Sequence, residues 1–279
     1  MARGLTSRAF ADVRAVCGSA SPPAAALWVT SLVARLPACA RTRSLSPADQ
    51  VWARSGASFR TPNGAMVSLP PAYVLGAREM YCRNVYLRTG LTMPGDGWVV
   101  DLGANRGLFS VWAAVSGASV AAVEAQQGFA LLIEALAEHN CVRERIHVEV
   151  ALASGTGTSG SRVGVVSDDQ RWMAASHGTL DRPADLSVPQ LMAACNISRI
   201  GLLKMDIEGG EFAVLAEEED LSWLERVGQL ALEVHPAFGD APALIERLGA
   251  AGFCTSLRDN DGHQVPAGSA ALAYAYCRR

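Results

Sequence analysis

The sequence predicts an α/β protein with a parallel, doubly wound sheet, preceded by a smaller extension of helices and a hairpin. From residue 98 onward, short apolar runs alternate with helical stretches at the spacing of βαβ units, which predicts parallel strands with helices on both faces. Residues 1 to about 90 show no regular period and are interrupted by prolines, which predicts short pieces. We therefore expect an extension over residues 1–85 and a larger domain over residues 86–279.

The composition excludes several classes of protein. Of the 279 residues, 50% are hydrophobic and 18% charged, so the chain can bury a large core and is not disordered. Its 24 basic and 27 acidic residues give a net charge of −3, whereas a nucleic-acid surface would need a basic excess. Seven cysteines without a CxxC pair favour reduced thiols, and the apolar run at residues 24–34 is shorter than the ~20 residues that cross a bilayer. We expect a soluble, cytoplasmic protein without a nucleic-acid or membrane partner.

The extension contains three predicted elements. Two helical stretches cover residues 5–16 and 24–36, and residues 57–60 and 65–69 form a hairpin around Asn63-Gly64, a dipeptide typical of tight turns. Such a segment can serve as a cap, as a lid or as the contact of a homodimer, and all three roles stay open.

The larger domain contains seven predicted strands and three predicted helices. The glycine-rich stretch 154–161 and the stretch 167–183 are predicted as loops. The second loop carries Trp172 and His177, which could line a substrate pocket, although a surface excursion is the simpler interpretation. The predicted strands cover residues 98–102, 119–123, 146–151, 200–205, 229–234, 253–257 and 271–276, and the helices cover residues 108–115, 129–139 and 242–251.

A glycine-rich turn between the first strand and the first helix of this domain is the first candidate site. Its glycines let the backbone approach a ligand, and the helix N-terminus offers unpaired N–H groups to an anion. Glu124 ends the next strand, where a carboxylate can accept hydrogen bonds from the ribose of an adenosine-containing cofactor. Asp101 would repel a diphosphate but attract the ammonium group of S-adenosylmethionine. A tight turn capped by a carboxylate is the alternative interpretation of the segment Asp101-Leu102-Gly103-Ala104-Asn105-Arg106-Gly107.

Two further strand ends carry ionisable residues. Lys204, the only lysine of the chain, and Asp206 stand at the end of a buried strand, where open α/β sheets bind ligands. Glu208 and Glu211 follow, and each could simply complement the dipole of a helix N-terminus. At the end of the next strand, His235 is the best general-base candidate because an imidazole has a near-neutral pKa, and a structural histidine that caps the strand is the alternative. The adjacent Glu233 could orient a neighbour.

These segments together resemble the FkbM family of S-adenosylmethionine-dependent methyltransferases. The resemblance rests on a DxGANxG turn at 101–107, on Val123-Glu124, on a KxDxEGxE segment at 204–211 and on residues 232–235, and it runs from about residue 85 to the end of the chain. It implies the class I methyltransferase sheet of seven strands with the last one antiparallel. Ala125-Gln126 stands where the family often has a proline. The residues expected at the cofactor are Asp101, Gly103, Ala104, Asn105, Gly107, Glu124 and Ala125.

The resemblance also implies O-methylation, since known members methylate hydroxyl groups on natural products and sugars. We expect a small-molecule hydroxyl acceptor, with His235 or Asp206 as the base and Lys204 either pairing with a carboxylate or stabilising an alkoxide. A divalent ion held by Asp206 and Glu208 is the alternative, for which the sequence offers no evident third ligand. The competing functions are an N-methyltransferase, a non-catalytic cofactor-binding protein, and an NAD-dependent oxidoreductase, which Asp101 and Asn105 disfavour.

Overall fold

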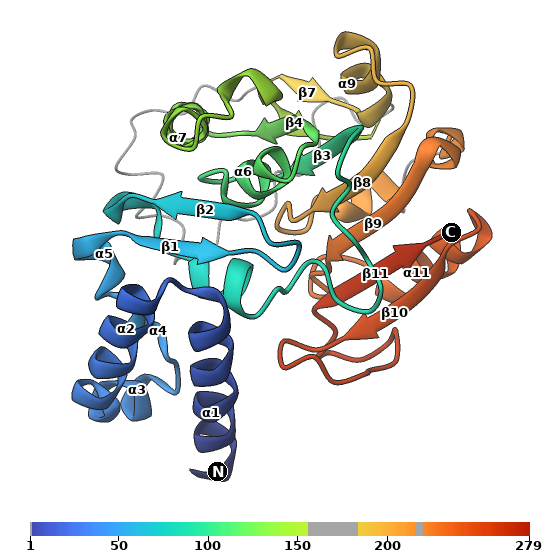
Figure 1. Cartoon of the computed structure of the whole chain (residues 1–279). Helices are drawn as coiled ribbons and strands as arrows, with labels where there is room; N and C mark the ends of the chain where they lie inside the picture. The colour runs from blue at the N-terminus through green and yellow to red at the C-terminus, as the bar shows by residue number, and fades with distance from the viewer. Residues whose placement is uncertain (1, 156–183, 216–219) are drawn as a thin grey trace. The chain divides into compact units, whose positions relative to one another are not determined.

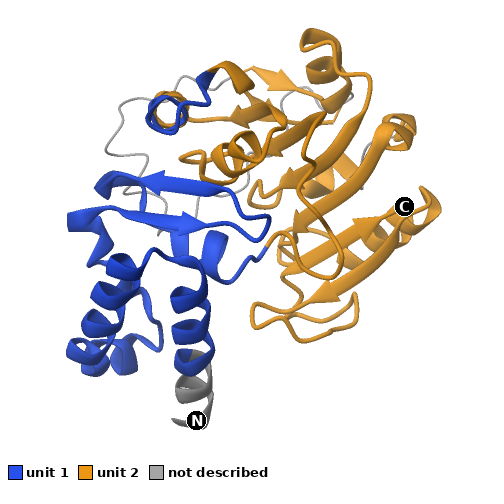
Figure 2. Ribbon diagram, viewed as in Figure 1, with its two compact units in different colours: residues 1–85, 135–143 blue, residues 86–134, 144–279 orange. Residues whose placement is uncertain are grey.

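The computed structural model describes residues 2–155, 184–215 and 220–279. The chain divides into two compact units, and Figure 2 colours them separately: unit 1 comprises residues 1–85 and 135–143, and unit 2 comprises residues 86–134 and 144–279. Most of the first predicted loop and all of the second one, including Trp172 and His177, lie outside the described residues.

Unit 1 consists of short helices and a two-stranded antiparallel hairpin (Figure 1). The two predicted helices and the predicted hairpin are confirmed. Three further helices were not predicted, because they are only four to seven residues long and show no complete hydrophobic period. The elements are α1 (Ala2–Ser19), α2 (Pro22–Ala34), α3 (Leu36–Thr42), α4 (Ser46–Asp49), α5 (Trp52–Ser55), β1 (Ala57–Arg60), β2 (Met66–Leu69), the 3-10 helix η1 (Pro71–Tyr73) and the π-helical turn η2 (Arg78–Cys82).

A chain of aromatic rings forms the core of unit 1. Trp52 lies between Trp28 and Phe59, with ring centroids 6.2 Å and 5.2 Å away, and Phe59 stacks on Tyr81 at 5.2 Å. A buried ion cluster lies beside these rings. In it the guanidinium of Arg78 contacts the carboxylates of Asp12 and Asp49, and Trp28 Nε1 donates to Asp49 Oδ1 at 2.7 Å. Unit 1 therefore has a core of its own.

Unit 2 is built on one seven-stranded sheet in the order β10-β11-β9-β8-β3-β4-β5 (Figure 1). The last strand, β11, is antiparallel to both of its neighbours, whereas β9, β8, β3, β4 and β5 pair in parallel. This confirms the predicted sheet, although β11 begins later than predicted. The strands are β3 (Trp98–Leu102), β4 (Ser119–Glu124), β5 (Ile146–Val150), β8 (Ile200–Met205), β9 (Val227–Glu233), β10 (Cys254–Arg258) and β11 (Tyr274–Arg278).

Helices pack on both faces of this sheet. A core cluster joins one face to α9, α10 and α11, and it includes Leu102, Met205 and Leu232. Because successive strand residues point to opposite faces, Asp101, Lys204 and Glu233 point to the other face, that of α6. The helices are α6 (Leu108–Val115), α7 (Gln127–His139), η3 (Arg143–Arg145), α9 (Val188–Ala194), α10 (Glu211–Leu215), η5 (Ser222–Arg226) and α11 (Ala241–Ala250), and a short parallel pair adds β6 (Leu152–Ala153) and β7 (Asp185–Leu186).

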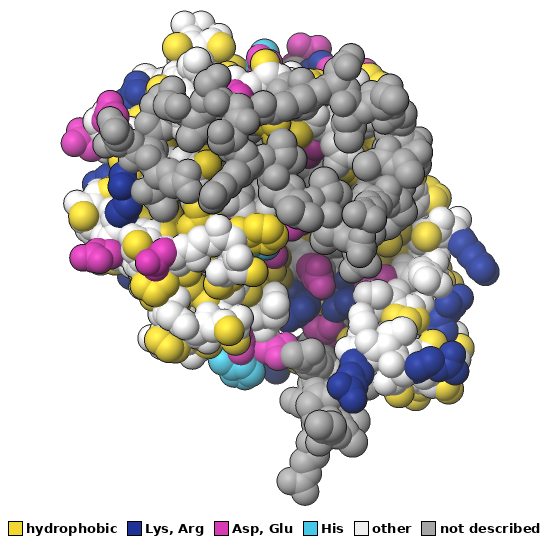
Figure 3. All heavy atoms as spheres, turned by 180° about the vertical axis from the view of Figure 1, so that it is seen from behind, with side chains coloured by type: hydrophobic (Ala, Val, Ile, Leu, Met, Phe, Trp, Pro, Cys, Tyr) yellow, Lys and Arg dark blue, Asp and Glu magenta, His cyan; other side chains and the backbone are white. Residues whose placement is uncertain are grey.

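The surface mixes charged and apolar side chains, and Figure 3 shows both signs of charge on the face opposite to that of Figure 1. Within the described residues, no single helix has the length and apolar character needed to span a bilayer. Helices α2 and α3 meet that test only as a pair, and the chain bends by 74° between them. Among the residues whose side chains the structure describes, the exposed large apolar ones are Phe10, Leu27, Val33, Leu36, Met66, Leu75, Leu131 and Phe238.

Candidate active site

The turn between β3 and α6 is held in a shape that requires glycine. Gly103 has a φ of +74°, and a Cβ at this position would lie 1.8 Å from the carbonyl oxygen of Asp206. Gly107, the N-cap residue of α6, has a φ of +82°, and a Cβ there would lie 3.1 Å from Ile133. Between them Asn105 adopts a left-handed φ of 50°, which asparagine tolerates better than most residues. The turn thus approaches the end of β8 closely.

Glu124, the last residue of β4, supports this turn from the neighbouring strand. Its carboxylate is 7% exposed and accepts the backbone N–H groups of Asn105 and Gln126 at 2.8 and 2.9 Å. Burial raises the pKa of Glu124, although these two hydrogen bonds act in the opposite direction. The N–H of Gln126 is one of the two donors to Glu124, and a proline at this position would lose that bond.

Asp101 and Lys204 form a buried ion pair on the face of α6. They are opposite each other in the β3–β8 register, and Lys204 Nζ lies 3.0 Å from Asp101 Oδ1 and donates to the Gly103 carbonyl at 2.7 Å. Ser110 of α6 donates to Asp101 Oδ2 at 2.6 Å. Burial lowers the pKa of Lys204, but Asp101 and Asp206 raise it above its ordinary value, so the amine stays charged.

The placement of Asp101 differs from the prediction. The sequence predicts that the Asp101 carboxylate faces a ligand in the turn, where its charge selects an ammonium group over a diphosphate. The side chain is instead fully buried and neutralised by Lys204. A buried ammonium needs a counter-charge, and Asp101 supplies it. Direct contact between Asp101 and a cofactor stays a prediction.

Tyr86 joins the ends of β8 and β9. Its hydroxyl lies 2.8 Å from Asp206 Oδ2 and 2.9 Å from Glu233 Oε2. A phenol has one hydrogen, so only one of these bonds can be donated by Tyr86, and a carboxyl must donate the other. Burial, followed by the charge of Asp206, raises the pKa of Glu233 to about 8. Because its pKa is raised, Glu233 is the carboxyl suited to donate the second bond.

His235 is held by two glutamates. Its backbone N–H and its Nδ1 lie 2.7 and 3.0 Å from Oε1 of Glu211, which is completely buried, and its Nε2 lies 3.4 Å from Glu208 Oε2. Burial lowers the pKa of His235, but the bond to Glu211 and the glutamate charges raise it to about 9. The near-neutral pKa expected for His235 is therefore wrong. With a pKa of about 9, the imidazole is mostly protonated at pH 7.

The same side chains could also hold a cation. The ligand atoms of Asp206, Glu208 and His235 lie within 4.8 Å of one another, so the structure supplies the third ligand that the sequence did not reveal. Carboxylate and imidazole ligands together suit a divalent transition metal. Glu208 is 60% exposed and adopts a left-handed φ of 54°, which sets its carboxylate beside the imidazole rather than in the first turn of α10.

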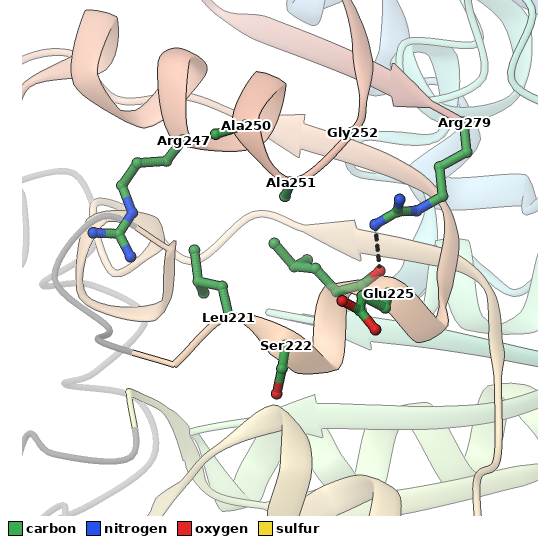
Figure 4. A pocket seen from close by; sticks show the side chains of 9 residues that line it. Leu221, Ser222, Glu225, Arg247, Ala250, Ala251, Gly252 and Arg279 are labelled. Carbon is green, nitrogen blue, oxygen red and sulfur yellow. Dashed lines mark hydrogen bonds between the residues drawn. The ribbon is translucent and has the colours of Figure 1, made fainter.

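The sequence identified most of these residues but missed two. Ser110 was detectable, since it is the polar residue in the apolar helix LFSVWAAV. Tyr86 gave no signal, because it lies in an irregular segment before β3. A pocket of about 540 Å³ near η5 and α11, lined by Arg247 and Arg279, contains none of the predicted site residues (Figure 4). Arg279 there donates to the carbonyls of Leu224 in η5 and of Val227, the first residue of β9. This pocket therefore lies at the amino ends of the parallel strands, whereas the candidate site lies at their carboxyl ends.

The strand order, the antiparallel β11 and the cluster at the carboxyl ends of β3, β4, β8 and β9 define a class I methyltransferase. A family model, the methyltransferase FkbM domain, matches residues 101–253, which is more than half of the chain. The chain belongs to the FkbM methyltransferase family. It is a transferase, so the oxidoreductase alternative is wrong, and membership of the family implies S-adenosylmethionine as the methyl donor.

Several individual proteins are similar to this chain. The 31-O-demethyl-FK506 methyltransferase FkbM of Streptomyces tacrolimicus is 31% identical over 236 residues. The match covers 70% of this chain and 88% of that protein. The AMB antimetabolite synthetase AmbE of Pseudomonas aeruginosa is 29% identical over 233 residues, which cover 66% of this chain but 11% of AmbE. Among solved structures, the methyltransferase domain of METTL16 has a TM-score of 0.46 and 12% identity, with 83% of this chain and 79% of that one covered.

Proposed function

We propose that the protein transfers a methyl group from S-adenosylmethionine to a hydroxyl group of a small natural product or sugar moiety. The observation that carries this proposal is the partial exposure of the Asp206 carboxylate. Asp206 is 27% exposed at the carboxyl end of β8, while Lys204 and Tyr86 beside it are buried. A partly exposed carboxylate in a rigid polar setting suits proton abstraction from a hydroxyl. The printed name of the Streptomyces relative describes an O-demethyl substrate, which favours oxygen as the methylated atom.

The residues around the β3–α6 turn fit the methyl donor. Gly103 and Gly107 leave no side chain in the turn, and Glu124 keeps lone pairs on both carboxylate oxygens for a ribose diol. Next to it, the buried Oε1 of Gln126 has no hydrogen-bond partner among the described residues and can accept a bond from a ligand. S-adenosylmethionine, when bound, supplies a methyl group already activated on a sulfonium sulfur. The protein has to align the acceptor, exclude water and take up one proton.

Asp206 is the proton acceptor in this proposal. His235 carries a proton at neutral pH, since its pKa is raised to about 9, and cannot take another. Lys204 is bound to Asp101 and to the Gly103 carbonyl, and in this proposal it balances the charge of the carboxylates. Asp206 Oδ2 is already bonded to Tyr86, which leaves Oδ1 for the hydroxyl proton of the acceptor.

The test combines binding with turnover. We expect S-adenosylhomocysteine to bind in calorimetry and NAD to show no binding. We expect 31-O-demethyl-FK506 or a member of a panel of methyl glycosides to gain one methyl group by mass spectrometry. Asp206→Asn should lower kcat by about 10²–10⁴-fold with little change in S-adenosylhomocysteine affinity. The control is Asp240→Asn, because asparagine also caps α11 at that exposed position.

Two results would overturn the proposal. Methylation of amino analogues but of no hydroxyl compound would assign the enzyme to N-methylation. An unchanged kcat in Asp206→Asn would remove the assigned base.

Metal-assisted activation of the hydroxyl is the second candidate, favoured by the proximity of Asp206, Glu208 and His235. It predicts that a chelator abolishes turnover, that Mg²⁺ or Mn²⁺ restores it, and that Glu208→Gln is as damaging as Asp206→Asn. In the metal-free reaction a chelator has no effect, and Glu208→Gln changes kcat little.

A further inference from the structure

Tyr86 occupies a fixed position between two strand ends of the candidate site. It is 6% exposed, and its ring packs edge-on against Phe109 and Tyr274, with centroids 5.8 and 6.0 Å away. The ammonium of Lys204 lies 5.3 Å from the centre of the same ring. These contacts fix the ring, so the direction of its hydroxyl is fixed as well.

The hydroxyl connects two acidic groups in a definite order. Lys204 Nζ lies 3.9 Å from Asp206 Oδ2, so the two groups form an ion pair. Tyr86 accordingly donates its single hydrogen to Asp206 at 2.8 Å. The 2.9 Å contact with Glu233 Oε2 is then a bond in which the carboxyl of Glu233 donates to the phenol oxygen. Tyr86 thereby acts on Asp206 as a donor.

We propose that Tyr86 is a positioning residue for methyl transfer, whose hydroxyl holds Asp206 Oδ2 so that Oδ1 takes the proton of the acceptor. This inference rests on the proposed function. In the step, the O–H bond of the acceptor breaks and its proton passes to Asp206 Oδ1. The electron pair that remains on the acceptor oxygen forms the new bond to the methyl carbon, and the pair of the broken carbon–sulfur bond stays on sulfur.

The charge-assisted bond from Tyr86 has an energetic role as well as a geometric one. Without it, the short side chain of Asp206 can turn toward Lys204, 3.9 Å away, and form a closer ion pair. A carboxylate displaced by about 1 Å from its productive position can cost on the order of 10²-fold in rate. Tyr86 therefore affects the chemical step without touching the acceptor.

The variant Tyr86→Phe tests this role, because it removes the hydroxyl and keeps the ring. We expect kcat to fall about 10–100-fold with the acceptor that the proposed function identifies. KM for that acceptor and the affinity for S-adenosylhomocysteine should change less than about 3-fold. In an Asp206→Asn background, Tyr86→Phe should cause no further loss of kcat, since residues that act as a unit are non-additive. Tyr276→Phe, the same change at a buried tyrosine of β11, serves as the control.

A second readout requires no acceptor. A phenol proton that is hydrogen-bonded and shielded from water exchanges slowly and gives a far-downfield proton NMR signal. We expect such a signal in the wild type and in Tyr276→Phe, its loss in Tyr86→Phe and its displacement in Asp206→Asn.

The outcomes separate the two proposals. If Tyr86→Phe leaves kcat unchanged, the positioning role is wrong, even if the wild-type protein gives the downfield NMR signal. An additive loss of kcat in the double variant also overturns it. If the wild-type protein binds S-adenosylhomocysteine but methylates no hydroxyl compound, the proposed function fails and this inference fails with it.

Discussion

Gly103 determines the shape of the turn that we assign to the cofactor. Its φ of +74° is unfavourable for other residues, and the space that a Cβ would need contains the carbonyl oxygen of Asp206, 1.8 Å away. Gly103→Ala must therefore displace either the turn or the end of β8. We expect S-adenosylhomocysteine affinity to fall more than about 10-fold, and the free energy of unfolding to fall by about 2–5 kcal/mol in urea denaturation.

A matched control for this substitution is Gly97→Ala. Gly97 has a φ of +78° but has no atom within 4 Å of the position of an added Cβ, so alanine there meets backbone strain without a clash. We expect a loss of about 1 kcal/mol and unchanged affinity for S-adenosylhomocysteine. Equal effects of the two variants would mean that the approach of Asp206 is not the reason for the glycine at position 103.

The pair formed by His235 and Glu211 makes stability depend on pH. The pKa of His235 rises from 6.5 to about 9 on folding, because the bond to Glu211 and the glutamate charges outweigh burial. The folded protein thus holds this proton more tightly than the unfolded chain. The resulting stability is fully present below pH 6.5 and is lost as the pH rises through about 9. Glu233, with a pKa raised from 4.5 to about 8, acts in the same direction.

Urea denaturation between pH 6 and pH 9.5 measures this effect. We expect the free energy of unfolding to fall by about 1–2 kcal/mol over this range, after allowance for solvent screening of the imidazole. His235→Gln should flatten the pH dependence. His263→Gln, at a side chain that is 77% exposed, should leave it unchanged. A stability that rises with pH over this range would contradict the assigned pKa of His235.

At the scale of single residues, the sequence predicts which residues gather but not their protonation states. Strand ends in a parallel sheet meet at one edge, so the proximity of Glu124, Lys204, Asp206 and His235 follows from the order of elements. The burial of Asp101 and the charge of His235 depend on partners in other elements, Lys204 and Glu211, which no local pattern specifies. The role of Tyr86 could not be predicted either, because its partners Asp206 and Glu233 lie in distant parts of the sequence.

At the scale of elements, long periodic segments were predicted well and short ones poorly. Helix α6 coincides with its predicted limits, and all seven strands of the main sheet were expected, because apolar runs bounded by turn residues are strong signals. Helix α9 was missed although Ser187 and Gln190 form a capping box, a signal that needs only the four residues from Ser187 to Gln190. The pair β6 and β7 has two residues in each strand, too few for any pattern.

At the scale of the whole molecule, the relevant feature is that each of the two units has its own interior. Unit 2 has a continuous apolar cluster between its sheet and α9, α10 and α11, and unit 1 has the aromatic rings around Trp52. Units with separate cores need not unfold together. We therefore expect differential scanning calorimetry to resolve more than one transition. The role of unit 1 as a cap, a lid or a dimer contact stays a prediction.

The buried cluster of Arg78, Asp12 and Asp49 provides a way to assign the transition of unit 1. Arg78 is 6% exposed, and its guanidinium is shared by the two carboxylates, so Arg78→Met would leave Asp49 without its cation and Asp12 with Arg83, whose Nε lies 3.8 Å from Oδ1. Removing one partner of a buried ion pair costs about 3–5 kcal/mol. We expect Arg78→Met to lower the temperature of one transition by more than about 5 °C and to leave the other in place. Arg60→Met, at an exposed arginine of β1, is the control and should shift neither transition. An Arg78→Met protein that melts as the wild type does would show that the carboxylates of Asp12 and Asp49 find other partners or take up protons at little cost.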